Sequence, residues 1–214
     1  MSPPDTAKSG RKTGKYSKKG GNSGRKPILE GGNMKKTLIV VDMQNDFITG
    51  PLGSADAEAI VPAVKARVSD YLCSKDTQVI FTRDTHYPES YADTIEGKKL
   101  PVPHCYKDTY GWEVIPELME EADKEKTKVR FVNKTHFGSV DLMEYIETHD
   151  NIEYIELCGV CTDICVVSNA LILKASNKDF PVLVNANLCA GTSKENHDAA
   201  LLTMKNCHID VEGV

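Results

Sequence analysis

Residues 153–167 read EYIELCGVCTDICVV, and this stretch decides the fold. Glu153–Cys158 predicts a short, mostly apolar strand, Gly159 provides a turn, and a helix is expected over Asp163–Asn177. A strand that leads directly into a helix is typical of a βαβ unit. Cys165 lies in the first turn of the expected helix, where the helix dipole and a nearby cation lower the pKa of a thiol.

The same alternation continues along the chain on both sides of this stretch. Because strands that alternate with helices form parallel sheets, we predict an α/β fold with three αβα layers and a central, mainly parallel six-stranded sheet. The predicted strands are Thr37–Asp42, Gln78–Thr82, Val129–Asn133, Glu153–Cys158, Val182–Asn185 and one near His208–Val211. The predicted helices are Ala57–Cys73, Val140–Thr148, Asp163–Asn177 and Lys194–Asn206. Residues 84–113 show no regular period, and such long loops are usually functional.

Charge is divided unevenly along the chain. Residues 1–33 contain eight Lys or Arg and two Asp or Glu, whereas residues 34–214 contain 18 and 29. The basic segment is rich in Gly, Ser and Lys and buries too little surface to offset chain entropy, so we expect it to be disordered. We interpret it as an extension ahead of a natural start at Met34; a tail that binds nucleic acid or an anionic surface is the alternative. Residues 34–214 form the predicted folded domain.

Composition also bears on the class of protein. No run approaches the roughly 18 apolar residues of a membrane span, and the N-terminus lacks the apolar segment of a secretory signal. The seven cysteines are an odd number and mostly lie in apolar runs, which favours reduced thiols over a disulfide framework. We therefore expect a cytoplasmic protein with neither membrane nor nucleic-acid partners.

Polar residues follow the predicted strands. Asp42 ends the first strand, Asp84 and His86 follow the second, and Lys134 follows the third. Ligands bind at the carboxyl ends of parallel strands, so we expect these residues to share one crevice with Cys165. Each residue alone has a common structural explanation. A cysteine such as Cys165 is more often a small buried hydrophobic residue, an aspartate such as Asp42 is often a cap, and a lysine such as Lys134 is usually a solvated charge. Together, a carboxylate can take the thiol proton and an ammonium can stabilise the thiolate.

Three segments resemble the isochorismatase-like cysteine hydrolases: VVDMQNDF around Asp42, NKTHFGS around Lys134 and GVCTDICV around Cys165. The resemblance covers nearly all of residues 34–214 in the right order and spacing. It implies a catalytic triad of these three residues, hydrolysis of a small amide through a Cys165 thioester, and a homo-oligomer. It also implies a cis Val160–Cys161 peptide bond and an oxyanion hole made by the backbone amides of Cys161 and Cys165.

Cys161 departs from the family pattern, which often has a small residue such as Ala at this position. The spacing Cys158-Gly-Val-Cys161 matches a redox motif or half of a zinc site. We reject this interpretation because no second CxxC occurs elsewhere. No role is assigned to the remaining cysteines, Cys73, Cys105, Cys189 and Cys207.

The long loop predicts a metal site. Asp84, His86 and a later His104 offer a carboxylate and two imidazoles, a set that suits zinc, iron or manganese. Nicotinamidases in this family carry a similar Asp-x-His and later His. The resemblance thus implies one divalent metal ion (Zn, Fe or Mn) that binds the pyridine nitrogen of nicotinamide, the small-molecule amide substrate. Glu96 is the candidate for a further ligand, with a solvated loop charge as the alternative, and Glu89 is a weaker competitor.

Two aromatic residues are candidates for the substrate pocket. Phe47 matches a ring-stacking position, although a core position is equally common, and Trp112 lines the pocket or caps the loop. Pro101 replaces an aromatic residue often found in nicotinamidases. Two alternatives remain open: a metal-independent cysteine hydrolase of another small amide, ureido or carbamoyl compound, and a non-catalytic binding relative. Isochorismate cleavage is disfavoured because those relatives replace the nucleophilic cysteine, which is present here as Cys165.

Overall fold

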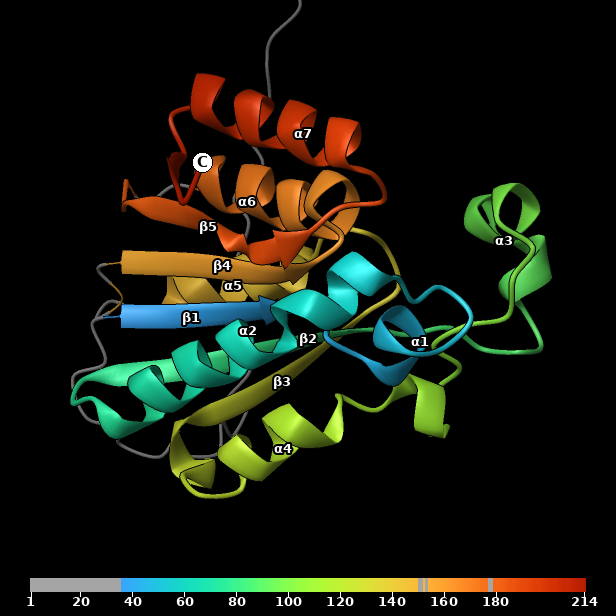
Figure 1. Ribbon diagram of the computed structural model, residues 1–214, viewed down its shortest axis with the longest axis horizontal. Coiled ribbons are helices and arrows are strands. Elements are labelled where there is room, and N and C mark those ends of the chain that lie inside the picture. The colour runs from blue at the N-terminus through green and yellow to red at the C-terminus, as the bar shows by residue number, and fades with distance from the viewer. Residues whose placement is uncertain (1–35, 150–151, 153, 177–178) are drawn as a thin grey trace, which may run out of the picture. The chain divides into compact units, whose positions relative to one another are not determined.

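The sheet is the centre of the fold (Figure 1). The computed structural model describes residues 36–149, 152, 154–176 and 179–214, so the predicted N-terminal extension and the start at Met34 lie outside the described residues. All neighbouring strands are parallel, in the order β3-β2-β1-β4-β5-β6, which confirms the predicted α/β sheet of six strands. The strands are β1 (Lys36–Val41), β2 (Thr77–Asp84), β3 (Val129–Lys134), β4 (Tyr154–Val160), β5 (Val182–Ala190) and β6 (Asp210–Glu212).

Helices flank the sheet. In Figure 1, α2 lies in front of the strands and α5 behind them. α4 packs against α2, whereas α6 contacts both α5 and α7, which confirms the three layers. Among the described helices, none is both long and apolar enough to cross a membrane. The α-helices are α1 (Asn45–Ile48), α2 (Ala55–Cys73), α3 (Ile95–Lys99), α4 (Pro116–Ala122), α5 (Val140–Thr148), α6 (Val167–Lys174) and α7 (Lys194–Asn206).

Several predicted bounds differ from the observed ones. α2 starts at Ala55 because the Ser54 side chain caps it by accepting a hydrogen bond of 3.1 Å from Ala57 N. The helix predicted over 163–177 is two elements, a π-helical turn over Thr162–Val166 followed by α6. The residues from 84 to 113 are not wholly irregular, since they contain α3 and two 3₁₀ turns, Tyr91–Asp93 and Tyr110–Trp112. β5 extends to Ala190, beyond the predicted end, because it keeps pairing with β4 after a register shift.

The strand order creates a crevice beside β1. β2 and β3 lie on one side of β1, and β4, β5 and β6 lie on the other, so the connections after β1 and β4 leave their carboxyl ends in opposite directions. Gly159 has a φ of 114°, and a Cβ at this position would lie 2.2 Å from Val41 O. Only glycine lets β4 approach β1 this closely at the carboxyl end. The buried β1 residues Leu38, Ile39, Val40 and Val41, each 0% exposed, anchor this edge in the core.

An ion pair between the partly exposed Arg67 and the buried Glu156 links α2 to the middle of β4. Glu156 is 0% exposed, and Arg67 donates hydrogen bonds of 2.9 Å and 2.6 Å to its two carboxylate oxygens. The Tyr71 hydroxyl donates another of 2.9 Å. This carboxylate is held in the core by partners from a single helix, because both Arg67 and Tyr71 belong to α2.

We predict that Arg67→Met lowers the free energy of unfolding by about 3 kcal/mol, because it leaves the Glu156 carboxylate buried without its cation. The double variant Arg67→Met/Glu156→Leu should recover most of this loss, since it removes the stranded charge. Urea unfolding followed by circular dichroism measures both. A single variant as stable as the wild type would contradict the prediction.

Candidate active site

Three side chains that the sequence assigned to one crevice do meet there. Lys134 Nζ lies 2.6 Å from Asp42 Oδ2 and 3.5 Å from Cys165 Sγ. All three residues are buried, with exposures of 4%, 0% and 6%. Asp42 follows β1, Lys134 ends β3, and Cys165 lies in the π-helical turn after β4. A carboxylate, an ammonium and a thiol are therefore in mutual reach at the carboxyl ends of three strands.

Local structure fixes the carboxylate of Asp42. Its backbone adopts a left-handed conformation with a φ of 51°, which Asp tolerates better than most residues. The Thr82 hydroxyl donates a hydrogen bond of 2.7 Å to Asp42 Oδ1 and accepts one of 3.2 Å from Asp42 N. Thr82 lies on β2 beside β1, so the neighbouring strand orients the carboxylate, leaving Oδ2 for Lys134.

The backbone around Cys165 is also held. The Val160–Cys161 peptide bond is cis, as the resemblance implies. Cys161 O accepts hydrogen bonds from Ile164 N at 3.1 Å and from Val166 N at 3.0 Å, which closes the π-helical turn. Asn169 Nδ2 donates 2.8 Å to Cys165 O. π-Helical turns are frequent at functional sites, and this one presents the thiol toward Lys134.

Burial dominates the electrostatics of the three groups. Burial raises the pKa of the Cys165 thiol well above its ordinary value, and Lys134 offsets only part of this. The expectation of a lowered thiol pKa is therefore wrong for the resting protein, because desolvation outweighs the cation. Burial likewise raises the pKa of Asp42, which makes it a stronger base. Burial opposes the charge of Lys134, yet Asp42, Cys165 and Asp84 together raise its pKa, so the ammonium stays protonated.

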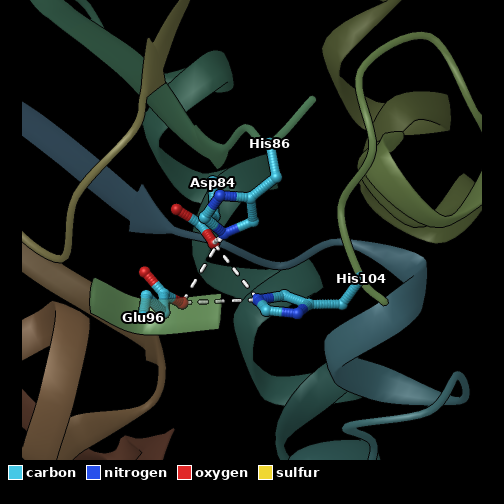
Figure 2. A group of neighbouring side chains, drawn as sticks. All are labelled: Asp84, His86, Glu96 and His104. Carbon is cyan, nitrogen blue, oxygen red and sulfur yellow. Dashed lines mark ion pairs between the residues drawn. The ribbon is translucent and has the colours of Figure 1, made fainter. Parts of the chain in front are cut away.

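A second cluster lies next to these residues (Figure 2). One ligand atom from each of four side chains, Asp84, His86, Glu96 and His104, lies within 4.8 Å of all the others. Asp84 Oδ2 is 2.8 Å from His86 Nε2 and 3.6 Å from His104 Nε2. Glu96 Oε1 is 3.5 Å from each imidazole. The structure thus brings together all four predicted metal ligands, whereas Glu89 is exposed and outside the group.

The donor set fits a divalent cation. Ligand atoms about 2.1 Å from a zinc ion lie roughly 3.4 Å apart in a tetrahedral site, close to the spacing of most pairs here. Among the described residues, His86 Nε2 is buried without a hydrogen-bond partner of acceptable geometry, although a carboxylate is near. His104 Nδ1 lies 2.8 Å from Val102 O, which assigns the proton to Nδ1 and leaves Nε2 free to coordinate.

In the absence of an ion, the carboxylates and imidazoles of this cluster shift one another's pKa values. Burial opposes protonation of His86 and His104, yet the two carboxylates raise the pKa of each imidazole to about 9. Burial also opposes ionisation of Glu96, but the imidazoles lower its pKa to about 2. The pKa of Asp84 is lowered in the same way. Two anionic carboxylates thus attract positive charge to this position, as protons or as a metal ion.

Two supporting residues were missed by sequence reasoning. Gln44 holds the backbone of Asp84 with two hydrogen bonds. Its Oε1 accepts a hydrogen bond of 2.7 Å from Asp84 N, and its Nε2 donates one of 2.9 Å to Asp84 O. Thr82 holds Asp42 as described above. Asp84 then bridges the two clusters, with Oδ1 3.3 Å from Lys134 Nζ and Oδ2 near the imidazoles. Gln44 lies in the quoted segment VVDMQNDF, which offered a signal, whereas Thr82 gave none.

A cavity of about 620 Å³ opens onto both clusters. Cys165, Asp84, Glu96 and His104 contribute to its lining, as does Cys161. Its apolar wall consists of Phe47, Leu52, Ile95, Leu100, Phe137 and Ile164. An apolar wall above a few polar groups is typical of a small-molecule site.

The two candidate aromatics differ in position. Phe47 lines the cavity, with its ring 5.6 Å from that of His104. Trp112 lies outside the described lining and does not form the pocket wall. Its Nε1 donates a hydrogen bond of 2.8 Å to Thr85 Oγ1, and the guanidinium carbon of Arg83 lies 3.9 Å from the centre of its ring. Trp112 therefore fastens the loop, which was the other interpretation of this residue.

The remaining cysteines form no further metal group within the described residues. Cys158 is fully buried in β4, whereas Cys161 lines the cavity, so the CxxC spacing does not build a site. All seven cysteines are free thiols.

A carboxylate, an ammonium and a thiol in contact beneath a small-molecule cavity are the groups that a cysteine-dependent hydrolase requires. A family model described as the isochorismatase domain matches residues 36–213. The chain therefore belongs to the isochorismatase family, and the hydrolase class predicted from the sequence is confirmed.

Individual relatives agree with this assignment. The Bacillus subtilis isochorismatase family protein PncA is 31% identical over 185 residues, which cover 81% of this chain and 96% of that protein. The crystal structure of nicotinamidase/pyrazinamidase PncA from Bacillus subtilis has a TM-score of 0.74 at 29% identity, covering 84% of this chain and 100% of that one. A pyrazinamidase of Pyrococcus horikoshii, solved in complex with zinc, has a TM-score of 0.67 at 25% identity, with coverages of 84% and 99%.

We predict that the wild-type protein binds one equivalent of Zn²⁺ and that His104→Ala weakens this affinity at least roughly tenfold, because a ligand is lost. His136→Ala is the matched control, since His136 lines the same cavity but lies outside the four-residue group. Equilibrium dialysis with metal analysis measures both. Equal affinity in wild type and His104→Ala would exclude this cluster as the binding site.

Proposed function

We propose that this family member is a metal-dependent cysteine amidohydrolase that converts nicotinamide and water to nicotinate and ammonia. One observation carries the proposal: a single cavity is lined both by Cys165, whose thiol contacts Lys134, and by Asp84, Glu96 and His104 of the four-residue cluster. A ring nitrogen and a carboxamide are the two polar groups of nicotinamide. Two separate polar clusters beneath one apolar wall match that arrangement.

Acylation begins at the thiol. The Cys165 proton passes to Asp42, whose raised pKa favours accepting it, while the Lys134 ammonium 3.5 Å from Sγ stabilises the thiolate. The thiolate attacks the carboxamide carbon, and the backbone amides of Cys161 and Cys165 donate to the oxyanion. Asp42 then returns its proton to the amide nitrogen. The C–N bond breaks, ammonia leaves, and a thioester to Cys165 remains.

Deacylation uses the same groups, with water as the nucleophile and Cys165 as the leaving group. Asp42, again ionised, accepts a proton from a water molecule that attacks the thioester carbon. The C–S bond breaks, Cys165 regains its proton from Asp42, and nicotinate leaves. Lys134 keeps its charge throughout, because the surrounding carboxylates raise its pKa.

The four-residue cluster orients the substrate. A divalent ion held there would supply Lewis-acid character for a ring nitrogen, and zinc, iron and manganese all suit two imidazoles with carboxylates. Asp84, His86, Glu96 and His104 would hold it, and Phe47 beside His104 would pack on the ring. Orienting the ring sets the carboxamide against Sγ, which contributes through proximity rather than bond chemistry.

The same proposal includes a cytoplasmic location. Seven free cysteines, including the proposed nucleophile, are suited to a reducing compartment. Assembly as a homo-oligomer stays a prediction.

We predict that Cys165→Ala abolishes ammonia release from nicotinamide, because no other group in the proposed mechanism forms the thioester. Cys73→Ala is the matched control, since Cys73 is an exposed thiol at the end of α2 and should leave turnover unchanged. A coupled assay for ammonia measures both. Wild-type turnover in Cys165→Ala would remove the proposed nucleophile.

We further predict that chelation of the bound metal lowers nicotinamide turnover at least roughly a hundredfold, because misplacing the reacting groups by about 1 Å has a cost of this size. Adding back Zn²⁺, Fe²⁺ or Mn²⁺ separately should restore turnover and identify the metal. If chelated protein keeps full turnover, the metal-dependent part of the proposal fails and a metal-independent cysteine hydrolase takes its place.

A further inference from the structure

The turn that carries Cys165 is fastened to a segment that the proposed mechanism does not use. This segment is the connection between β5 and α7, residues 191–193, together with the first turns of α7. Thr192 belongs to it and lines the cavity beside Cys161 and Cys165. Two side chains of the π-helical turn, Thr162 and Asp163, hydrogen-bond to it.

Asp163 makes the stronger of the two connections. Its Oδ1 accepts a hydrogen bond of 2.8 Å from Thr192 N, and its Oδ2 accepts one of 2.6 Å from Thr192 Oγ1. A carboxylate that accepts two short hydrogen bonds from one residue fixes both the distance and the orientation of that residue. Thr192 Oγ1 also accepts 2.9 Å from Asn196 Nδ2, which extends the connection into α7.

Thr162, three residues before Cys165, makes a second contact with this segment. Thr162 is 0% exposed, and its hydroxyl lies 2.8 Å from His197 Nδ1 on α7. Gly191 lets the connection approach, because a Cβ there would lie 2.9 Å from Asp163 Oδ1 and 2.8 Å from His197 Cβ. The turn is thus attached to α7 through Thr162, and Asn169 on α6 donates a hydrogen bond to its Cys165 O.

We propose that Asp163 is a positioning residue: by binding Thr192 it holds the π-helical turn in the register that keeps Cys165 Sγ within reach of Lys134 Nζ. This inference rests on the proposed function for its catalytic consequence. The Sγ–Nζ contact of 3.5 Å depends on where the turn places the thiol, because a rotation of the turn would change this distance. The segment after β5 therefore acts on the reaction without touching the proposed reacting atoms.

The test compares Thr192→Val, which removes the hydroxyl at nearly constant volume, with Thr192→Ser, which keeps it. Thr192→Val should lower kcat for nicotinamide roughly tenfold with KM changed less than about twofold, because the nucleophile shifts while the volume of this cavity-lining side chain is nearly kept. Thr192→Ser should retain kcat. Lys194→Ala is the control, since Lys194 pairs with Asp198 on the exposed side of α7.

A second measurement does not depend on the substrate. The rate at which iodoacetamide alkylates Cys165, followed by peptide mass spectrometry, should fall in Thr192→Val toward the rate in Lys134→Met, because the thiolate loses its cation. A merely loosened structure would expose the buried thiol and raise this rate. An unchanged or raised rate, or loss of activity in Thr192→Ser as well, overturns the inference. If the wild type releases no ammonia, the proposed function fails, and the alkylation rates alone decide the positioning role.

Discussion

The arrangement depends on one buried cation, the ammonium of Lys134. It lies 2.6 Å from Asp42, 3.3 Å from Asp84 and 3.5 Å from Cys165 Sγ, with almost no exposure to water. An ammonium in such a place is stable only if anions and hydrogen-bond acceptors surround it. β3 ends at Lys134, and β1, β2 and the turn after β4 each bring one of its partners, so the parallel sheet fixes the geometry of the site.

Asp84 connects the two halves of the site. One of its oxygens faces Lys134 and the other faces the imidazoles of His86 and His104. Gln44 holds its backbone on both the N–H and the C=O side, which fixes the position from which the carboxylate reaches both clusters. The charge of the four-residue cluster and the charge of Lys134 are therefore coupled through the side chain of Asp84.

Much of this site could be predicted because strand ends are visible in sequence. Asp42, Asp84 and Lys134 each follow an apolar run, and parallel strands bring such positions together. Glu96 was left with an alternative because its position depends on α3, a five-residue helix with no recognisable period. Thr82 and Gln44 act on residues 40 positions away in the chain, which local patterns do not reveal. The raised pKa of Cys165 was missed because burial, not the neighbouring residue types, decides its direction.

The most direct test of the account is to capture the covalent intermediate. Wild-type protein is mixed with nicotinamide, quenched in acid during turnover, and its peptides are analysed by mass spectrometry. A nicotinoyl thioester is expected on the peptide that contains Cys165, and it should be absent in Lys134→Met, where the thiolate has lost its cation. Ammonia release with no adduct, or with an adduct on another cysteine, would contradict the role given to the Lys134–Cys165 contact.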